Sequence, residues 1–334
     1  MKLYASMTVS PSTVRKFKEH LLREYGTLEA LDPLIYTPIS TGDGLTEEMK
    51  QLSKEGVNVM FDSGGYHVQT NNGDFDELYN YIMPFYDKNR WAHQYVLPDN
   101  VPLSDDDDET VERKVKETRT NAKLSYHFLP EELKSRAVPV IQGSKYPHIT
   151  DCIDTYSELD QIQTVGFGSF ETFGKNNGIN FISERVAETL RYAVNLAHER
   201  GLKIHAFGVG GPTAIPVLGK LGVDSFDCSS WLRAAGYGDI YFPFRTPRNV
   251  THKTDRTGPK VFRSDLEELK KETGHKCPFC ASYDKLRDSR IIRILHNLIV
   301  LRDMAESINS YSTEEMLDLM NDKSRYTTIL RSIS

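Results

Sequence analysis

The sequence lacks any apolar run long enough to cross a membrane. Its longest apolar stretches fall short of the ~20 residues that a spanning helix needs. The first residues, MKLYASMTVSPSTVRKF, also lack the apolar core of a secretory signal peptide. We therefore expect a protein with no membrane partner, located in the cytoplasm, or in the host cytoplasm if a phage encodes it.

Cysteine is scarce, and two other signals are missing. Four cysteines, unevenly placed among 334 residues, argue against a disulfide framework. No GxGxxG follows the first apolar run, which argues against a dinucleotide-binding sheet. Positive charge is not in excess either, since the formal net charge is -6. The surface as a whole does not indicate nucleic-acid binding, although a local basic face could still hold phosphates.

Short apolar runs alternate with longer amphipathic stretches along most of the chain. Most runs are bounded by Gly, Pro, Asp or Ser, as strands usually are. We expect strands at residues 2–7, 33–39, 58–62, 93–98, 137–142, 163–166, 203–208 and 225–228. We expect helices at residues 12–25, 46–55, 75–88, 108–128, 146–158, 182–200 and 212–221. Eight strand–helix units at this spacing predict an α/β fold of the (β/α)8 TIM-barrel type, with an open doubly wound sheet as the alternative.

Polar residues at the expected strand ends are the site candidates, because active sites of this barrel class lie at the C-terminal ends of the strands. If Phe61 and Phe226 face the helices, alternation turns Asp62 and Asp227 into the barrel. A single strand-end Asp can equally cap the next helix. Several polar groups on different strands instead favour one pocket for a flat, hydrogen-bonding ligand such as a purine. The strand-end residues are Asp62, Asp99, Gln142, Gly166, Gly208 and Asp227.

Five motifs resemble those of the tRNA-guanine transglycosylase superfamily. They are FDSGGYHVQ, IQG, GFG, FGVGG and GVDSFDCSSWLR, in the order in which the family has them. DSGGY and FDC are the most specific of the five. The resemblance spans residues 58 to about 300, and it implies an enzyme that exchanges guanine in a nucleic acid for another purine-like base.

The resemblance also implies roles for individual residues. Asp227 matches the nucleophile that traps the sugar as a covalent aspartyl-glycosyl intermediate. Asp62 matches the general acid/base, which protonates the leaving base and deprotonates the incoming one. Tyr66 matches the aromatic ring that stacks on the base, and Arg233 an arginine near the nucleic-acid backbone. The other residues implied to bind the base are Asp99, Gln142, Gly143, Gly166, Phe167 and Gly208.

A Cys/His cluster forms a separate signal near the C-terminus. His275, Cys277 and Cys280 lie together in HKCPFC, and His296 follows. Two cysteines and two histidines can fill a closed tetrahedral site for structural Zn²⁺, although a lone CxxC can also be a redox pair. The superfamily has a zinc site here, usually Cys-x-Cys-x-x-Cys with a later His in His-Asn-Leu. This chain departs from that pattern, since His275 stands in the place of the first Cys and the spacing to His296 is shorter.

The pattern of strands and helices ends after the eighth expected strand, which suggests three regions. We expect a catalytic barrel core over residues 1–236, a zinc-binding insertion over 237–287, and a closing helix with a C-terminal tail over 288–334. The acidic run 105–108 is expected to be a solvated helix start. His67, His93, His205 and Cys152 are expected to be core or rim residues without a chemical role.

The departures from the family favour one nucleic acid over another. FDC is followed here by Ser229-Ser230-Trp231-Leu232-Arg233, without a second arginine before Gly238. Such features are similar to the branch that inserts 7-deazaguanine bases of the preQ0 type into DNA. We therefore expect DNA as the macromolecular substrate, tRNA as the alternative, and a homodimer as an option. The alternatives of another kind are a glycosidase-like barrel enzyme that does not act on nucleic acid and an inactive binding subunit.

Overall fold

A parallel sheet forms the centre of the molecule. The computed structural model describes residues 1–70, 73–103, 105–173, 179–253, 259–320 and 324–333, and part of the expected insertion, residues 254–258, lies outside this set. Within the described residues, nine strands form one sheet in the order β5-β4-β3-β2-β1-β11-β10-β7-β6. The strands are β1 (Lys2–Ser6), β2 (Leu34–Tyr36), β3 (Val59–Phe61), β4 (Gln94–Val96), β5 (Ala137–Val138), β6 (Val140–Ile141), β7 (Thr164–Phe167), β10 (Lys203–Ala206) and β11 (Ser225–Cys228).

The two ends of this sheet are halves of a single expected strand. β5 pairs with β4 and β6 pairs with β7, and only Pro139 separates them in the chain. Because proline has no backbone N–H, Pro139 interrupts the hydrogen-bond ladder, while the chain continues in the same direction from β5 to β6. The sheet therefore closes into a barrel of eight strands when β5 and β6 are counted together, as the sequence predicts.

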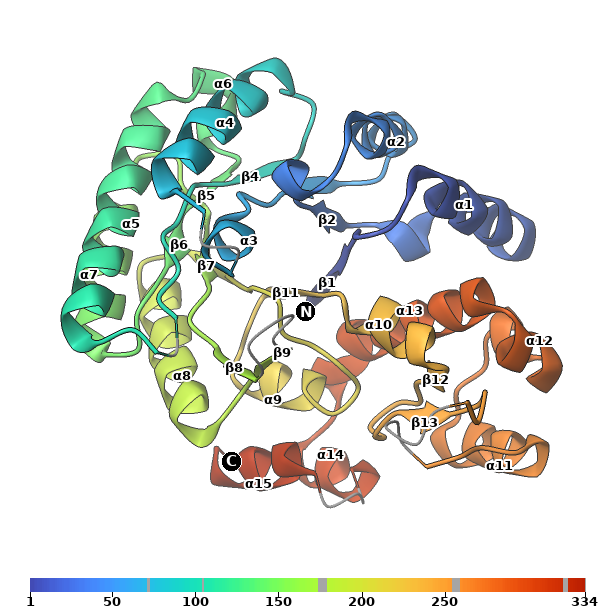
Figure 1. The fold of residues 1–334 in the computed structure, drawn as a ribbon. Coiled ribbons are helices and arrows are strands. Elements are labelled where there is room, and N and C mark those ends of the chain that lie inside the picture. The colour runs from blue at the N-terminus through green and yellow to red at the C-terminus, as the bar shows by residue number, and fades with distance from the viewer. Residues whose placement is uncertain (71–72, 104, 174–178, 254–258, 321–323, 334) are drawn as a thin grey trace.

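Helices follow the strands and surround the barrel, as Figure 1 shows for α4, α5, α7 and α8. Local signals start and stop them: Ser10 caps α1 by accepting from the Thr13 amide, and Gly26 ends it with a φ of 72°. The helices of the barrel are α1 (Pro11–Tyr25), α2 (Asp43–Lys54), α3 (Gly65–Thr70), α4 (Phe75–Lys88), α5 (Asp108–Phe128), α6 (Glu131–Lys134), α7 (Tyr146–Ser157), α8 (Glu184–Glu199), α9 (Ile215–Lys220) and α10 (Ser230–Tyr237).

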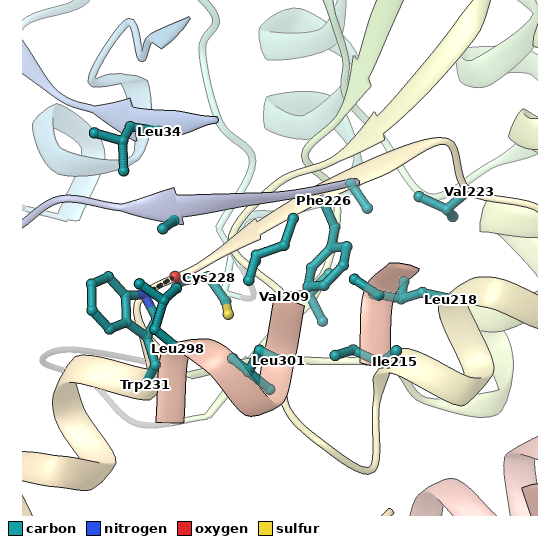
Figure 2. Packing of buried hydrophobic residues seen from close by; sticks show 14 of the residues in the cluster. Leu34, Val209, Ile215, Leu218, Val223, Phe226, Cys228, Trp231, Leu298 and Leu301 are labelled. Atoms are coloured by element: carbon teal, nitrogen blue, oxygen red, sulfur yellow. Dashed lines mark hydrogen bonds between the residues drawn. The ribbon is translucent and has the colours of Figure 1, made fainter. Parts of the chain in front are cut away.

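Two apolar layers hold the barrel together. The larger layer lies between strands and helices, and Figure 2 shows Phe226 and Cys228 of β11 in it, beside Leu298 and Leu301. The smaller cluster consists of Ile35, Met60, Val96, Val138 and Val140, with Tyr4 and Phe207 packed against it. These residues come from alternate positions of the strands, so they fill the barrel interior below the strand ends.

The chain after β11 builds a small subdomain and then returns to the barrel. β12 (Asp239–Ile240) pairs antiparallel with β13 (Arg248–Asn249), followed by α11 (Arg263–Thr273), a short 3-10 turn at Pro278–Cys280 and α12 (Tyr283–Asp288). Helix α13 (Arg290–Ser307) then packs against α10 and β1. α14 (Thr313–Leu319) and α15 (Arg325–Ser332) end the described chain near α9 and α8. The division into three regions remains a prediction.

Some local structure was not assigned from the sequence. Helix α3 and the antiparallel hairpin of β8 (Glu171–Phe173) with β9 (Ile179–Phe181) lie in segments for which we expected neither a helix nor a strand. The acidic run is only partly solvated: Asp107 caps α5, but Asp106 pairs with the buried Lys114 at 2.6 Å. None of the described helices combines the length and the apolar character that crossing a bilayer requires.

Candidate active site and metal centre

The nucleophile candidate Asp227 lies on the inner side of β11. Its neighbours Phe226 and Cys228 face the helices in Figure 2, so alternation directs Asp227 into the barrel. Asp227 Oδ2 accepts a 2.6 Å hydrogen bond from Ser6 Oγ, and Oδ1 accepts one of 2.8 Å from the Gly208 amide. The side chain is only 10% exposed. These donors hold a carboxylate in one orientation at the barrel mouth.

A buried histidine also contacts Asp227. His205 Nε2 lies 3.4 Å from Asp227 Oδ1, and His205 Nδ1 lies 2.9 Å from Ser225 Oγ. From the sequence, His205 was expected to be a core or rim residue without a chemical role. The His205 side chain is fully buried, but it contacts the candidate nucleophile. Ser6 was missed altogether. Its place at the end of the first strand, two residues after Tyr4, was the signal that could have identified it.

The acid/base candidate Asp62 directly follows β3. Thr37 Oγ1 donates a 2.6 Å hydrogen bond to Asp62 Oδ2. Burial raises the pKa of Asp62, and the negative charge of Asp227 raises this pKa further, while the Thr37 hydrogen bond lowers it. A carboxyl group with a raised pKa keeps its proton at higher pH, which suits a group that must protonate a leaving base.

Asp99 and Gln142 form the polar floor beside Asp62. Asp99 accepts from Gln142 Nε2 at 2.6 Å and from Ser63 Oγ at 2.9 Å. Burial raises the pKa of Asp99 to about 6, although the hydrogen bond from Gln142 lowers it. A Cβ atom at Gly65 would lie 2.5 Å from the Asp99 carbonyl oxygen, so only glycine allows this close approach.

Tyr66 and Arg233 lie at the rim. The Tyr66 ring is 39% exposed at the start of α3, which leaves a face for stacking. Burial raises the pKa of Tyr66, and the positive charge of Arg233 lowers it in part, so the two side chains lie near each other. This is the arrangement expected for a base-stacking ring beside a phosphate-binding guanidinium.

The remaining candidates contribute mainly backbone. Gly143 donates its amide to Ser169 Oγ at 2.6 Å, and Gly208 donates to Asp227. The Phe207 ring lies against Gly166. A Cβ atom at Gly166 would lie 2.0 Å from Phe207 Cε2, so the ring leaves no room for a side chain there. The Phe167 side chain is fully buried in the larger apolar layer, so this residue could contact a base only through its backbone.

The four candidate metal ligands lie together in the C-terminal subdomain. One ligand atom from each of His275, Cys277, Cys280 and His296 lies within 4.8 Å of the others. His296 Nε2 contacts the Tyr241 carbonyl oxygen at 2.8 Å, which leaves Nδ1 facing Cys277 Sγ at 3.4 Å. His275 Nε2 is buried without a hydrogen-bond partner. Two sulfur and two imidazole donors, one of them otherwise unpaired, fit a closed tetrahedral zinc site.

Two comparisons place the chain among known proteins. The sequence profile of a family described as "Queuine tRNA-ribosyltransferase" matches residues 94–310, which is more than half of the chain. The tRNA-guanine(15) transglycosylase of Aeropyrum pernix is 26% identical over 282 residues. This match covers 80% of the present chain but 49% of that protein, so the chain spans about half the length of this curated relative.

Proposed function

Because the chain belongs to the queuine tRNA-ribosyltransferase family, we propose that it exchanges guanine in a nucleic acid for another purine-like base. The observation that carries this proposal is the pairing of two unlike carboxyl groups at the barrel mouth. Asp227 is held by hydrogen-bond donors, whereas burial and the charge of Asp227 raise the pKa of Asp62. Carboxyl groups in such different environments can serve as nucleophile and acid in one reaction.

The proposed reaction has two steps. Asp227 attacks C1′ of the target nucleotide, the bond from C1′ to the base nitrogen breaks, and Asp62 gives its proton to the leaving guanine. The incoming base then gives a proton to Asp62 and attacks C1′, which breaks the ester bond to Asp227. The nucleotide must first leave its stack to reach a site at this depth. The second step returns to Asp62 the proton that it gives up in the first, so the complete exchange needs no external acid.

Zinc would take no part in these steps. The residues that would hold it are His275, Cys277, Cys280 and His296. Because His296 lies on α13, a zinc ion bound there would link the subdomain to this helix. Since all four positions of a tetrahedral ion are filled by side chains, no position is left for water or substrate.

For the macromolecular substrate we propose DNA, with a 7-deazaguanine of the preQ0 type as the incoming base. The support is the segment after FDC, which forms α10 and supplies Arg233 as its single arginine before Gly238. The family description and the relative both name tRNA, which makes tRNA the alternative.

The test is incorporation of a labelled base. Purified protein is incubated with labelled guanine and either DNA or unfractionated tRNA, and acid-precipitable label is counted. Label in DNA alone supports the full proposal, and label in tRNA alone replaces the substrate. A second assay adds unlabelled preQ0 to DNA or tRNA that carries labelled guanine and measures the guanine released. No incorporation in the first assay together with no release in the second would reject base exchange.

A further inference from the structure

A directional chain of hydrogen bonds crosses the barrel mouth and includes a residue that the proposed reaction does not use. The Gly143 amide donates to Ser169 Oγ at 2.6 Å. Ser169 Oγ donates to Gln142 Oε1 at 2.8 Å, and Gln142 Nε2 donates to Asp99 Oδ2 at 2.6 Å. Ser169 therefore connects the loop after β6 to the polar floor of the site.

The chemistry of the groups sets the direction of this chain. A backbone amide can only donate, so Ser169 Oγ accepts from Gly143 and its own proton is available for Gln142. An ionised carboxylate can only accept, so Asp99 requires the nitrogen of Gln142. Both contacts select the same orientation of the Gln142 carboxamide. A reversed amide would place Oε1 against Asp99 and leave the Ser169 proton without its acceptor.

Packing leaves the amide little room to move. Gln142 is 1% exposed. A Cβ atom at Gly168 would lie 2.6 Å from Gln142 Nε2, so the backbone of this residue closes one side of the amide. On the far side, Ser63 Oγ holds the second oxygen of Asp99 at 2.9 Å. In the part of the chain that the structure describes, two hydrogen bonds distinguish the oxygen end of the Gln142 amide from its nitrogen end, one to Asp99 and one from the Ser169 hydroxyl.

We propose that Ser169 is a specificity-determining positioning residue, whose hydroxyl keeps the N–H groups of Gln142 directed toward the bound base and so selects a 6-oxopurine over a 6-aminopurine. This inference rests on the proposed function, since it takes Asp99 and Gln142 as the base-reading groups. One N–H of Gln142 is bonded to Asp99, and the second is the donor for the 6-oxo group. A 6-amino group would instead meet a donor, which the site rejects. Asp99 then accepts from the N1–H and 2-amino side of the base.

The experiment compares two bases that differ only on the 6-position side. Guanine and 2,6-diaminopurine share the 2-amino group, but the latter carries a 6-amino group and no N1–H. Equilibrium dialysis with labelled guanine, with 2,6-diaminopurine as competitor, gives the ratio of their affinities. The variants are Ser169→Ala, Ser169→Thr, which keeps the hydroxyl, and Ser157→Ala as control. Ser157 donates to the Asp154 carbonyl oxygen at the exposed end of α7.

Loss of one neutral hydrogen bond changes an equilibrium by about fivefold. We expect the preference for guanine to fall by about this factor in Ser169→Ala, to return in Ser169→Thr, and to stay at the wild-type value in Ser157→Ala. Circular dichroism and zinc content confirm that each variant folds. An unchanged ratio in Ser169→Ala, or an equal loss of affinity for both bases, overturns the inference.

The outcome separates the inference from the proposed function. Wild-type protein that binds guanine and shows the Ser169 effect, but exchanges no base in DNA or tRNA, rejects the proposed function and leaves the inference standing. If the wild-type protein exchanges guanine but the ratio of the two affinities is unchanged in Ser169→Ala, the inference is rejected and the proposed function stands. Wild-type protein that binds neither base rejects both.

Discussion

Thr37 and Asp62 are joined by a 2.6 Å hydrogen bond in which the threonine hydroxyl donates to the carboxylate. This bond stabilises the ionised form of Asp62 and lowers its pKa against the raising effects of burial and of Asp227. Replacing Thr37 by Val removes the donor but keeps the shape. The pKa of Asp62 then rises further.

We therefore predict that Thr37→Val shifts the pH profile of base release. Release needs protonated Asp62, so the single-turnover rate falls as pH rises through the raised pKa. In Thr37→Val this fall moves to higher pH, whereas Thr37→Ser should leave it near the wild-type position. The measurement is the release of labelled guanine from nucleic acid at a series of pH values, made under the same conditions for the wild type and both variants. A fall that moves to lower pH would contradict the assignment of Asp62 as the acid.

Asp227→Asn should abolish exchange and the covalent intermediate together. Asn keeps the size of the side chain and an oxygen for the Gly208 amide, but it lacks the nucleophilic charge. We expect a rate loss of about a thousandfold or more, with binding of the nucleic acid retained. A denaturing gel should show a protein–nucleic acid adduct for the wild type and none for the variant. Asp224→Asn is the control, because Asp224 bonds to the Ile204 amide and His198 outside the barrel. Wild-type activity in Asp227→Asn would contradict the assignment of Asp227 as the nucleophile.

Asp99→Asn should make the protein more stable at neutral pH, at the cost of activity. The folded-state pKa of Asp99 is raised to about 6, so the native state holds the proton more tightly than the unfolded state does. Stability is therefore lost as pH rises from the unfolded pKa to about 6, and the loss is complete above that range. A pKa raised from 3.8 to about 6 corresponds to about 3 kcal/mol, so removing the charge should recover up to about 3 kcal/mol at pH 8 and only about 1 kcal/mol at pH 4.5. Thermal melts of both proteins at the two pH values give the difference, and an equal change at both would show that burial of the charge is not the cause.

One zinc ion per chain should copurify with the protein, and removing it should destabilise the C-terminal subdomain. Cys277→Ser should lose both zinc and stability, whereas Cys152→Ser should keep its zinc, since Cys152 is a buried residue of α7 and does not belong to the cluster. Asp303 Oδ2 lies 3.7 Å from His275 Nδ1, on the ring side opposite the unpaired Nε2. Carboxylates in this position orient a ligating histidine, so Asp303→Asn should weaken zinc binding by about tenfold. Elemental analysis and competition with a chelator measure both effects, and zinc-free wild-type protein would refute the site.

Arg302 should be a large contributor to stability. It is 6% exposed and donates to the carbonyl oxygens of Leu3, Ala30 and Pro33, and burial lowers its pKa to about 10. Arg302→Ala removes hydrogen bonds to three backbone carbonyl oxygens, of which that of Pro33 keeps another donor, the Ala5 amide, and should cost about 3 kcal/mol. Arg200→Ala is the matched control, because Arg200 pairs with Asp154 on the surface and should matter by less than about 1 kcal/mol. Urea denaturation of both variants measures the difference, and equal losses would contradict the prediction.

The barrel was predictable because its signals are local and repeated. Most of the eight apolar runs carry turn residues at their ends. Alternation alone directs Asp62 and Asp227 inward once Phe61 and Phe226 are assigned to the helices. Helix α3 was missed because it starts at Gly65, directly after Gly64, and glycine is a poor helix former. Its position depends instead on the fit of Gly65 against Asp99.

The partners of the site residues were harder to predict than the residues themselves. Ser6, Thr37 and Ser169 are short polar side chains without a motif, and each contacts a residue from a distant part of the chain. Only closure of the sheet reveals such contacts. His205 was expected to be a core or rim residue without a chemical role. It is buried, but burial does not distinguish a packed histidine from one that touches Asp227.

The bond from Ser6 to Asp227 joins residues 221 positions apart, from the first and last strands of the barrel. During synthesis on the ribosome, Ser6 is made long before β11, which carries its partner Asp227. Arg302 of α13, which donates to the Leu3 carbonyl oxygen, is made later still. A nascent chain that ends before β11 therefore lacks both Asp227 and the bond that orients it. On the proposed function, the ability to attack a sugar arises only after the first and last strands of the barrel have come together, so that an early nascent chain cannot react.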